Sequence, residues 1–202
     1  MIIQDLAQLR SRYGQPKERA VKKQLSSLDF HCKRFMSLSP FVVVSTCDET
    51  GRLDASPRGG EPGFVQVTEH GELLIPDATG NNRLDSLQNI VKTGRIGLLF
   101  MIPGVDETLR VNGTAVVSID EDDIQACLDH QNRLPLAVIR VNVEEAYLHC
   151  AKAYMRSRLW SQDAKIPRGQ LPTMNQMLHD QIGDPAEPES QESMLERYRK
   201  EI

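Results

Sequence analysis

Three short segments near the middle of the chain combine glycine, asparagine and arginine in patterns that suit the binding of a phosphate. Residues 56–60 read Ser-Pro-Arg-Gly-Gly, residues 80–87 read Gly-Asn-Asn-Arg-Leu-Asp-Ser-Leu, and residues 108–114 read Thr-Leu-Arg-Val-Asn-Gly-Thr. Arginine offers a fork of donors that matches a phosphate, and glycine lets a flat ring approach the backbone closely. Together the three segments could hold a phosphorylated planar molecule.

The second segment, residues 80–87, has the features of a helix start that binds an anion. Asn81 or Asn82 can cap the helix that the apolar spacing predicts after it. The first turn of a helix has unpaired N–H groups and a partial positive charge, and Arg83 adds further donors there. In the alternative interpretation, an asparagine caps the helix and Arg83 is simply solvated.

Each of the other two segments offers one arginine. Arg58 follows Ser56 and Pro57 in a glycine-rich turn, where it could stand over the edge of a ring or reach a phosphate. Pro57 indicates the edge or the end of a strand. Arg110 alternates with apolar neighbours and therefore points away from the core. An ordinary surface turn and an exposed strand arginine are the alternatives, so only the combined order of the segments indicates a site.

A basic cluster follows the last predicted strand. His149, Lys152, Arg156 and Trp160 are spaced by three and four residues, which brings them near one face of a predicted helix over residues 151–160. This basic face with an aromatic end would suit an anionic planar ligand. The alternative is a structural helix with solvated charges, in which Trp160 packs against a second subunit.

Short apolar runs separated by turns dominate the middle of the chain, in the order expected for consecutive hairpins. Helical patterns are few and lie between or outside these runs. This order predicts a mainly β (α+β) fold, a six-stranded antiparallel barrel with peripheral helices, rather than a doubly wound sheet. The strands would be drawn from residues 41–46, 53–57, 64–67, 72–75, 95–102, 108–118 and 136–147.

The length of 202 residues suits one core domain with terminal extensions. We expect an N-terminal helical arm over residues 1–40 and a barrel domain over residues 41–160. Residues 161–202 are polar and contain several prolines, which predicts an extended arm followed by a disordered acidic tail. A short final helix over residues 194–198 is the alternative for the tail.

The composition narrows the class of protein. The net charge of −4 forces no basic face and argues against a nucleic-acid partner. No apolar run approaches the roughly 20 residues needed to span a bilayer, and the first ten residues lack the pattern of a signal peptide. A cytoplasmic protein without a membrane partner is therefore expected. The four cysteines lack the paired spacing of zinc sites, so we expect free thiols and no metal.

In their order, the three segments resemble the pyridoxamine 5′-phosphate oxidase-like, FMN-binding split-barrel family, and within it the branch of PPOX-class FMN-dependent enzymes. The resemblance implies a split barrel that binds FMN. It places residues 56–59 against the isoalloxazine ring and ribityl chain, residues 75–77 beside the flavin, and the helix start at the phosphate. The implied cofactor contacts are Ser56, Pro57, Arg58, Gly59, Ile75, Pro76, Asp77, Asn82, Arg83, Thr108 and Arg110.

The resemblance also implies a homodimer in which each flavin lies at the subunit interface. Thr108 and Arg110 would then serve the flavin of the facing subunit, and the basic cluster of residues 149–160 would contact the substrate or that flavin. The chain lacks the Arg-x-Val-Leu-Leu-Lys strand and the C-terminal Arg-Leu-His-Asp-Arg motif of true pyridoxamine phosphate oxidases. Oxidation of a B6 vitamer is therefore not expected.

The expected function is that of an FMN-dependent oxidoreductase that transfers electrons or hydride to or from an unidentified small substrate. No residue stands out as an obligatory acid or base, which suits hydride transfer. One alternative is a non-catalytic carrier or sensor on the same fold that binds flavin, or haem with His149 as the axial ligand. The other is a structural dimer without a cofactor.

Overall fold

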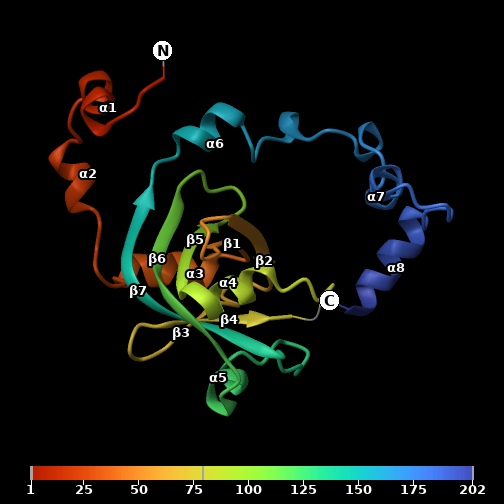
Figure 1. Cartoon of the computed structure of the whole chain (residues 1–202). Coiled ribbons are helices and arrows are strands. Elements are labelled where there is room, and N and C mark those ends of the chain that lie inside the picture. Colours follow the sequence, from red (N-terminus) through yellow and green to blue (C-terminus); the bar gives the residue numbers. More distant parts are fainter. Residues whose placement is uncertain (1, 79, 202) are drawn as a thin grey trace. The chain divides into compact units, whose positions relative to one another are not determined.

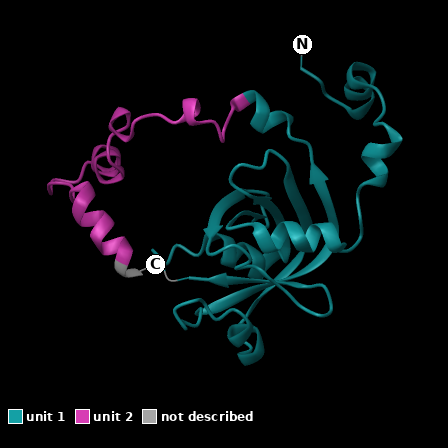
Figure 2. Ribbon diagram, turned by 180° about the vertical axis from the view of Figure 1, so that it is seen from behind, with its two compact units in different colours: residues 1–156 teal, residues 157–202 magenta. Residues whose placement is uncertain are grey.

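The computed structural model describes residues 2–78 and 80–201 (Figure 1). The chain divides into two compact units, Met1–Arg156 and Ser157–Ile202, which Figure 2 shows in different colours. The first unit contains a curled sheet and six helices. The second unit contains short helical segments. None of the helices in the described ranges is long and apolar enough to cross a bilayer.

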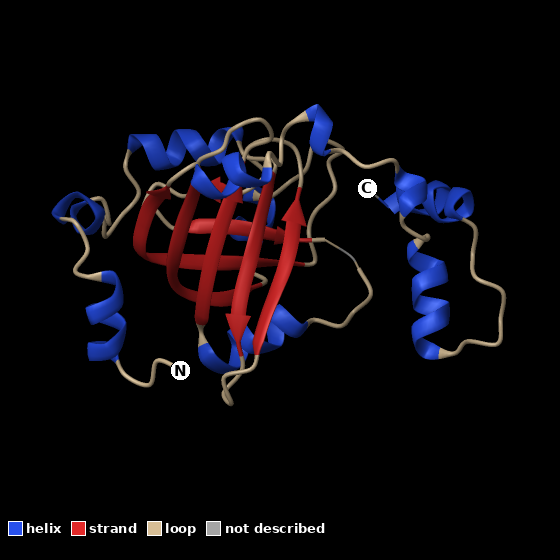
Figure 3. Cartoon of the chain, turned by 90° about the horizontal axis from the view of Figure 1, so that it is seen from above, coloured by secondary structure: helices blue, strands red, loops and turns tan. Residues whose placement is uncertain are grey.

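Seven strands form a single antiparallel sheet in the order β2-β1-β5-β6-β7-β4-β3. Figure 3 shows the strands curling into a half-barrel with helices outside it. The predicted antiparallel barrel with peripheral helices is confirmed, and the count is seven rather than six because a two-residue strand pairs with β4 at one edge. The strands are β1 (Phe41–Cys47), β2 (Leu53–Gly59), β3 (Gln66–Val67), β4 (Leu73–Asp77), β5 (Arg95–Met101), β6 (Thr108–Ser118) and β7 (Ala137–His149).

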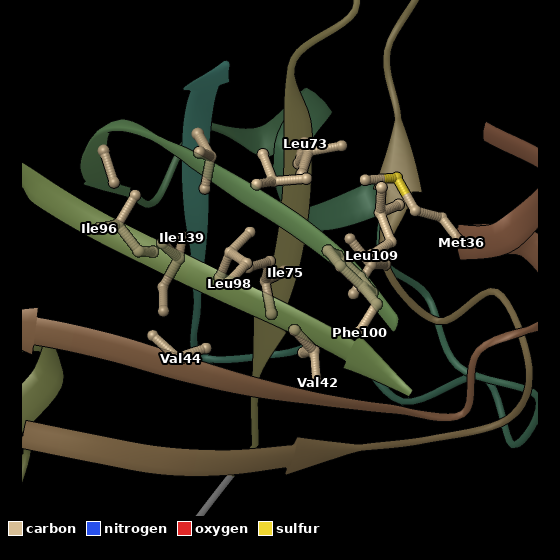
Figure 4. Packing of buried hydrophobic residues seen from close by; sticks show 14 of the residues in the cluster. Met36, Val42, Val44, Leu73, Ile75, Ile96, Leu98, Phe100, Leu109 and Ile139 are labelled. Carbon is tan, nitrogen blue, oxygen red and sulfur yellow. The ribbon is translucent and has the colours of Figure 1, made fainter. Parts of the chain in front are cut away.

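Alternation along the strands places the core inside the curled sheet (Figure 4). Val42 and Val44 of β1 are fully buried while the residues between them are partly exposed, as the period of two in a strand requires. Ile75 of β4 and Phe100 of β5 meet them there, also fully buried. β-Branched residues suit such a half-buried pleated surface, which is why the run over residues 41–46 forms a strand.

Three helices of the first unit pack against the sheet. Helix α3 (Phe30–Leu38) is capped by Asp29, whose side chain accepts a hydrogen bond from the N–H of Cys32 at 2.8 Å. The helix buries Met36 and Cys32, and burial raises the pKa of the Cys32 thiol to about 11. Helix α4 (Asp85–Thr93) covers β1 and β2, and α5 (Glu121–Ala126) packs on β4 and β7.

The chain before α3 contains two helices, and neither of them has a buried residue. Helices α1 (Leu6–Tyr13) and α2 (Glu18–Lys22) are separated at Gly14, where φ is +71°. After α2 the chain joins the sheet at one point, where Leu25 and Ala146 of β7 exchange two backbone hydrogen bonds of 2.9 Å. This exchange holds the segment before α3 beside β7.

The second unit is more helical than the sequence predicts. It contains two short 3₁₀ turns, η1 (Gln162–Ala164) and η2 (Arg168–Gln170), followed by α7 (Met174–Ile182) and α8 (Gln191–Glu201). The expectation of an extended arm followed by a disordered tail over residues 161–202 is therefore wrong, and the alternative of a final helix is correct. Thr173 caps α7, a signal that was present in the sequence. The division of the chain at residues 40 and 160 stays a prediction.

We predict that Phe100→Ala lowers the free energy of unfolding by about 3–5 kcal/mol, because it removes a fully buried aromatic side chain and leaves a cavity. Urea unfolding followed by circular dichroism measures the change. Phe30, which is 75% exposed, is the matched control, and Phe30→Ala should change the value by no more than about 0.5 kcal/mol. Equal losses in the two variants would contradict the assignment of Phe100 to the core.

Candidate functional site

The Ser-Pro-Arg-Gly segment lies inside a strand, not in the glycine-rich turn that the sequence predicts. Residues 56–59 form the second half of β2, which pairs with β1 along its whole length. The predicted edge position of Pro57 is confirmed, because β2 is the first strand of the sheet and proline is tolerated there. Side chains alternate, so Ser56 and Arg58 share the face of the buried β1 valines. Pro57 and Gly59 lie on the opposite face.

Arg58 forms an ion pair with Asp77, which was predicted as a second cofactor contact. The Nη2 atom of Arg58 lies 3.2 Å from Oδ1 of Asp77, and the two side chains are 24% and 10% exposed. Asp77 ends β4, the sixth strand in sheet order, while Arg58 is on the first. The curl of the sheet therefore brings together two predicted site residues from opposite sides of the barrel.

One donor of this pair has no partner. The Nε atom of Arg58 is buried and meets no acceptor within the described parts of the chain. A buried N–H without an acceptor costs about 1–3 kcal/mol, so an oxygen or nitrogen acceptor from a ligand would be favoured at this position. Burial also raises the pKa of Asp77, although the positive charge of Arg58 opposes the shift.

The predicted helix start is displaced along the chain. Helix α4 begins at Asp85, and the residue before it, Leu84, has a left-handed φ of +57° and makes no side-chain cap. Asn82 is also left-handed, with φ of +58°, and Asn81 accepts a hydrogen bond from the N–H of Arg83 at 3.1 Å. The prediction that Asn81 or Asn82 caps the helix is therefore wrong. Arg83 lies in the loop before the first turn.

Arg83 is held only weakly where it lies. Its Nε atom is 2.8 Å from Oδ2 of Asp85, and the arginine side chain is 76% exposed. Exposed ion pairs of this kind contribute little to stability, so an incoming anion can displace Asp85 at little cost. This geometry is consistent with a phosphate-binding role for Arg83.

Two hydrogen bonds fix α4 against the strands of the site. The hydroxyl of Ser86, in the first turn, donates to the carboxylate of Asp54 on β2. The amide of Asn89 donates to Thr46 Oγ1 on β1 at 3.0 Å. Because Ser86 and Thr46 are buried, these bonds are shielded from water. They bring the loop of Arg83 close to β2, and neither was predicted from the sequence.

The two predicted cofactor contacts on β6, Thr108 and Arg110, lie away from β2 within one subunit. Arg110 is opposite Leu99 and Tyr147 in the neighbouring strands, on the outer face of the sheet, so the prediction that it points away from the core is confirmed. Its guanidinium carbon lies 5.3 Å from the ring centroid of Tyr147. Thr108 is buried. Within one subunit, β6 is separated from β2 by β1 and β5, and the fold keeps Arg110 on the opposite face from Arg58.

The basic cluster does not form one helical face. His149 is the last residue of β7, and α6 covers only Lys152–Ser157. The Nε atom of Arg156 donates to the carbonyl oxygen of Lys152 at 3.1 Å. Trp160 lies beyond the helix, in the second unit. The predicted helix over residues 151–160 is therefore too long, and only Lys152 and Arg156 share it.

The side chain of Ile75 is fully buried and that of Pro76 is partly buried, so Ile75 belongs to the core and supports Asp77 through the backbone. All four cysteines are free thiols, as predicted. Within the described ranges, no group of three histidine, cysteine or acidic side chains could hold a metal ion. Two surface hollows of about 280 and 520 Å³ are lined by residues other than the predicted site residues.

A protein-family model described as pyridoxamine 5′-phosphate oxidase matches residues 28–150, more than half of the chain. The chain belongs to the pyridoxamine 5′-phosphate oxidase family. The match includes Arg58, Asp77, Arg83 and Arg110, and it ends before α6. Lys152, Arg156 and Trp160 therefore lie outside the part that defines this family. No curated protein matches the chain.

Solved structures with a similar arrangement are only distantly related to this member of the pyridoxamine 5′-phosphate oxidase family. HupZ of Group A Streptococcus is 18% identical, and the match covers 59% of this chain and 91% of that chain with a TM-score of 0.49. The FAD binding protein of Mycobacterium smegmatis is 15% identical, with coverages of 62% and 97% and a TM-score of 0.43. General Stress Protein 26 of Bacillus anthracis is 14% identical, with coverages of 59% and 94% and a TM-score of 0.43.

The residues of this family member have the chemistry that a flavin requires. A flavin ring carries carbonyl oxygens and ring nitrogens that accept hydrogen bonds, and the buried Nε atom of Arg58 has no acceptor in the described chain. FMN carries a phosphate, and Arg83 is a loosely held donor beside a helix start. The acidic neighbour Asp85 competes for Arg83, but only through an exposed contact. The donor set therefore fits FMN.

We predict that the stability difference between the wild type and Asp77→Asn depends on pH. The raised pKa of Asp77 means that the folded protein keeps a proton on this carboxyl at pH values where the unfolded chain has lost it. Stability therefore falls as the pH rises through this range, whereas an asparagine does not titrate. Urea unfolding at a series of pH values from about 4 upward should show the wild type losing stability relative to Asp77→Asn. If the wild type instead gains stability relative to Asp77→Asn as the pH rises, the attraction to Arg58 outweighs the cost of burying the Asp77 carboxylate.

Proposed function

We propose that this protein binds FMN and acts as an oxidoreductase that transfers electrons or hydride to or from a small substrate. The observation that supports this most strongly is the buried, unpartnered Nε atom of Arg58 in its ion pair with Asp77. Arg58 lies on β2, the strand that carries the Ser-Pro-Arg-Gly segment, and this strand is inside the span matched by the family model. Membership of the pyridoxamine 5′-phosphate oxidase family supports a flavin as the ligand.

The proposed ring contacts come from β2 and β4. Ser56 and Arg58 face one side of the edge strand, and Pro57 and Gly59 face the other. Arg58 would donate from Nε to the ring, and its positive charge would stabilise negative charge that builds up there. Asp77 would hold the guanidinium in place, while Ile75 and Pro76 fix the strand end that carries Asp77.

The proposed phosphate contacts come from the loop before α4. Asn82 and Arg83 precede the free N–H groups of the first turn, where the partial charge of the helix favours an anion. Arg83 would leave Asp85 and turn to the phosphate. The hydrogen bond from Ser86 to Asp54 would keep this loop in register with β2, so that ring and phosphate contacts are held at a constant spacing.

A bound flavin supplies the electron-pair transfer itself, and the protein binds and orients it. No acid or base is needed from the chain for hydride transfer. Lys152 and Arg156, both exposed on α6, are proposed to contact an anionic substrate or the flavin of a second subunit. His149 and Trp160 are proposed for the same role.

We propose a homodimer as the working form. The outer face of β1 and β5 carries the partly exposed apolar side chains of Phe41, Val43, Leu99 and Met101, an unusual surface for an isolated subunit. Arg110 lies on this same face of the sheet as Pro57. A second subunit packed on this face would therefore carry its own Arg110, and the neighbouring strand end at Thr108, toward the β2 segment.

The first experiment is an absorbance spectrum of the purified full-length protein, followed by release and identification of the pigment. A two-band oxidised-flavin spectrum with FMN released supports the proposal. A protein that is colourless and does not take up FMN on reconstitution refutes it. Oxidation of a reduced nicotinamide by the loaded protein would then separate an enzyme from a carrier.

We predict that Arg83→Ala weakens FMN binding by roughly 10- to 100-fold, the loss expected for one charge-assisted hydrogen bond. Riboflavin, which lacks the phosphate, should bind this variant as well as it binds the wild type. Quenching of flavin fluorescence measures both affinities. Lys92→Ala removes a charge from the last turn of the same helix and should change neither. If Arg83→Ala weakens riboflavin as much as FMN, Arg83 does not bind the phosphate.

A further inference from the structure

We propose that Lys23, Arg110 and Tyr147 form a binding site for the oxyanion group, phosphate or carboxylate, of a small molecule. Lys23 belongs to the segment after α2, which precedes the span matched by the family model. Only the identity of the molecule that carries the oxyanion group depends on the proposed function. The site itself follows from the contacts of these three residues.

The three side chains meet at the ring of Tyr147. The guanidinium carbon of Arg110 and the Nζ atom of Lys23 each lie 5.3 Å from its centroid. The two cationic groups are therefore at most about 11 Å apart. A cation over an aromatic face is attracted by the ring, and the edge of a stacked guanidinium still presents its N–H groups to a ligand.

The donors of Arg110 are available. A guanidinium has five N–H groups, and none of those on Arg110 has a hydrogen-bond or ion-pair partner in the described part of the chain. By contrast, Arg58, Arg83 and Arg95 each pair with a carboxylate. Two cations at one ring repel each other, and a bound anion would relieve that repulsion.

The neighbouring carboxylate forms an ion pair with neither cation within the described residues. Glu145 lies two residues before Tyr147 on β7, but its oxygens accept hydrogen bonds from the side-chain amides of Asn112 and Gln24. This carboxylate is therefore bonded to two neutral groups and to neither cation. The N–H donors of Arg110 therefore stay available for a ligand.

The backbone positions Lys23 before any ligand arrives. The two hydrogen bonds between Leu25 and Ala146 hold the segment against β7, and the Nζ atom of Lys23 donates to the carbonyl oxygen of Leu148 at 2.8 Å. Arg110 is fixed on the other side because it is paired with Tyr147 in the β6–β7 ladder. Less side-chain freedom is then lost on binding, which favours affinity.

The test is a calorimetric titration of the flavin-free, full-length protein with inorganic pyrophosphate. We expect saturable binding of pyrophosphate to the wild type. Lys23→Gln and Arg110→Gln should each weaken this binding about tenfold, whereas Lys23→Arg should keep the wild-type affinity. Lys22→Gln is the matched control, because Lys22 is the adjacent lysine and is paired with Glu18 on α2; it should bind like the wild type. Absence of saturable binding, or equal losses in Lys22→Gln and Lys23→Gln, would overturn the proposal.

A second variant guards against misfolding. Tyr147→Leu keeps an apolar side chain on β7 but removes the ring, and it should weaken pyrophosphate binding. The thermal midpoint of Lys23→Gln should stay at the wild-type value, which shows that its lost affinity is not caused by misfolding. If the affinity of Tyr147→Leu is unchanged, the ring does not organise the site and the proposal fails in this form.

Flavin affinities identify the source of the anion. If Lys23→Gln binds FMN as the wild type does, the oxyanion belongs to a separate anionic substrate. If it loses FMN affinity and keeps riboflavin affinity, the oxyanion is the flavin phosphate. Pyrophosphate binding by a protein that takes up no flavin would support the anion site and refute the proposed function, so the two failures are distinguishable.

Discussion

The ion pair between Arg58 and Asp77 is the constraint on which the arrangement of the site depends. It connects the first strand of the sheet to the sixth, so it forms only when the sheet curls. The apolar side chains inside the curl supply the driving force for that shape, and the charged pair specifies how the two strand ends meet. Because the pair is mostly buried, moving either charge away would leave the other uncompensated. The same contact positions the unpartnered Nε donor of Arg58.

Much of the fold could be predicted because the signals were local. A short run of β-branched residues over 41–46 indicated β1, and Pro57 indicated the edge strand. The barrel class followed from the hairpin order of the runs. Strand β3 has only two residues and lies within the run of residues 64–67 that the sequence predicts as a strand. Helix α7 was missed because the prolines and charges of that region outweighed a valid cap at Thr173, whereas a short final helix was expected only as an alternative.

The residues assigned to the candidate site stay a prediction, and their local geometry was predicted only in part. The glycines after Arg58 suggested a turn, but pairing with β1 imposes a strand, since tertiary context overrides local preference. The asparagines before α4 suggested a cap, yet the helix begins at Asp85. Contacts between distant residues, such as Ser86 with Asp54 and Lys23 with Tyr147, have no spacing signature at all. They depend on how the sheet and the arm are placed in three dimensions.

The two edges of the sheet have a consequence for how copies of the protein can associate. Pro57 leaves the outer strand β2 without one backbone donor, and β3 at the other edge is only two residues long. An incoming strand would therefore find a donor missing at one edge and a short ladder at the other, and such edges help to protect β-proteins against amyloid-like growth. Self-association is thereby directed from the edges to the faces. A finite assembly is then compatible with the fold, while continuous polymerisation by strand addition is disfavoured.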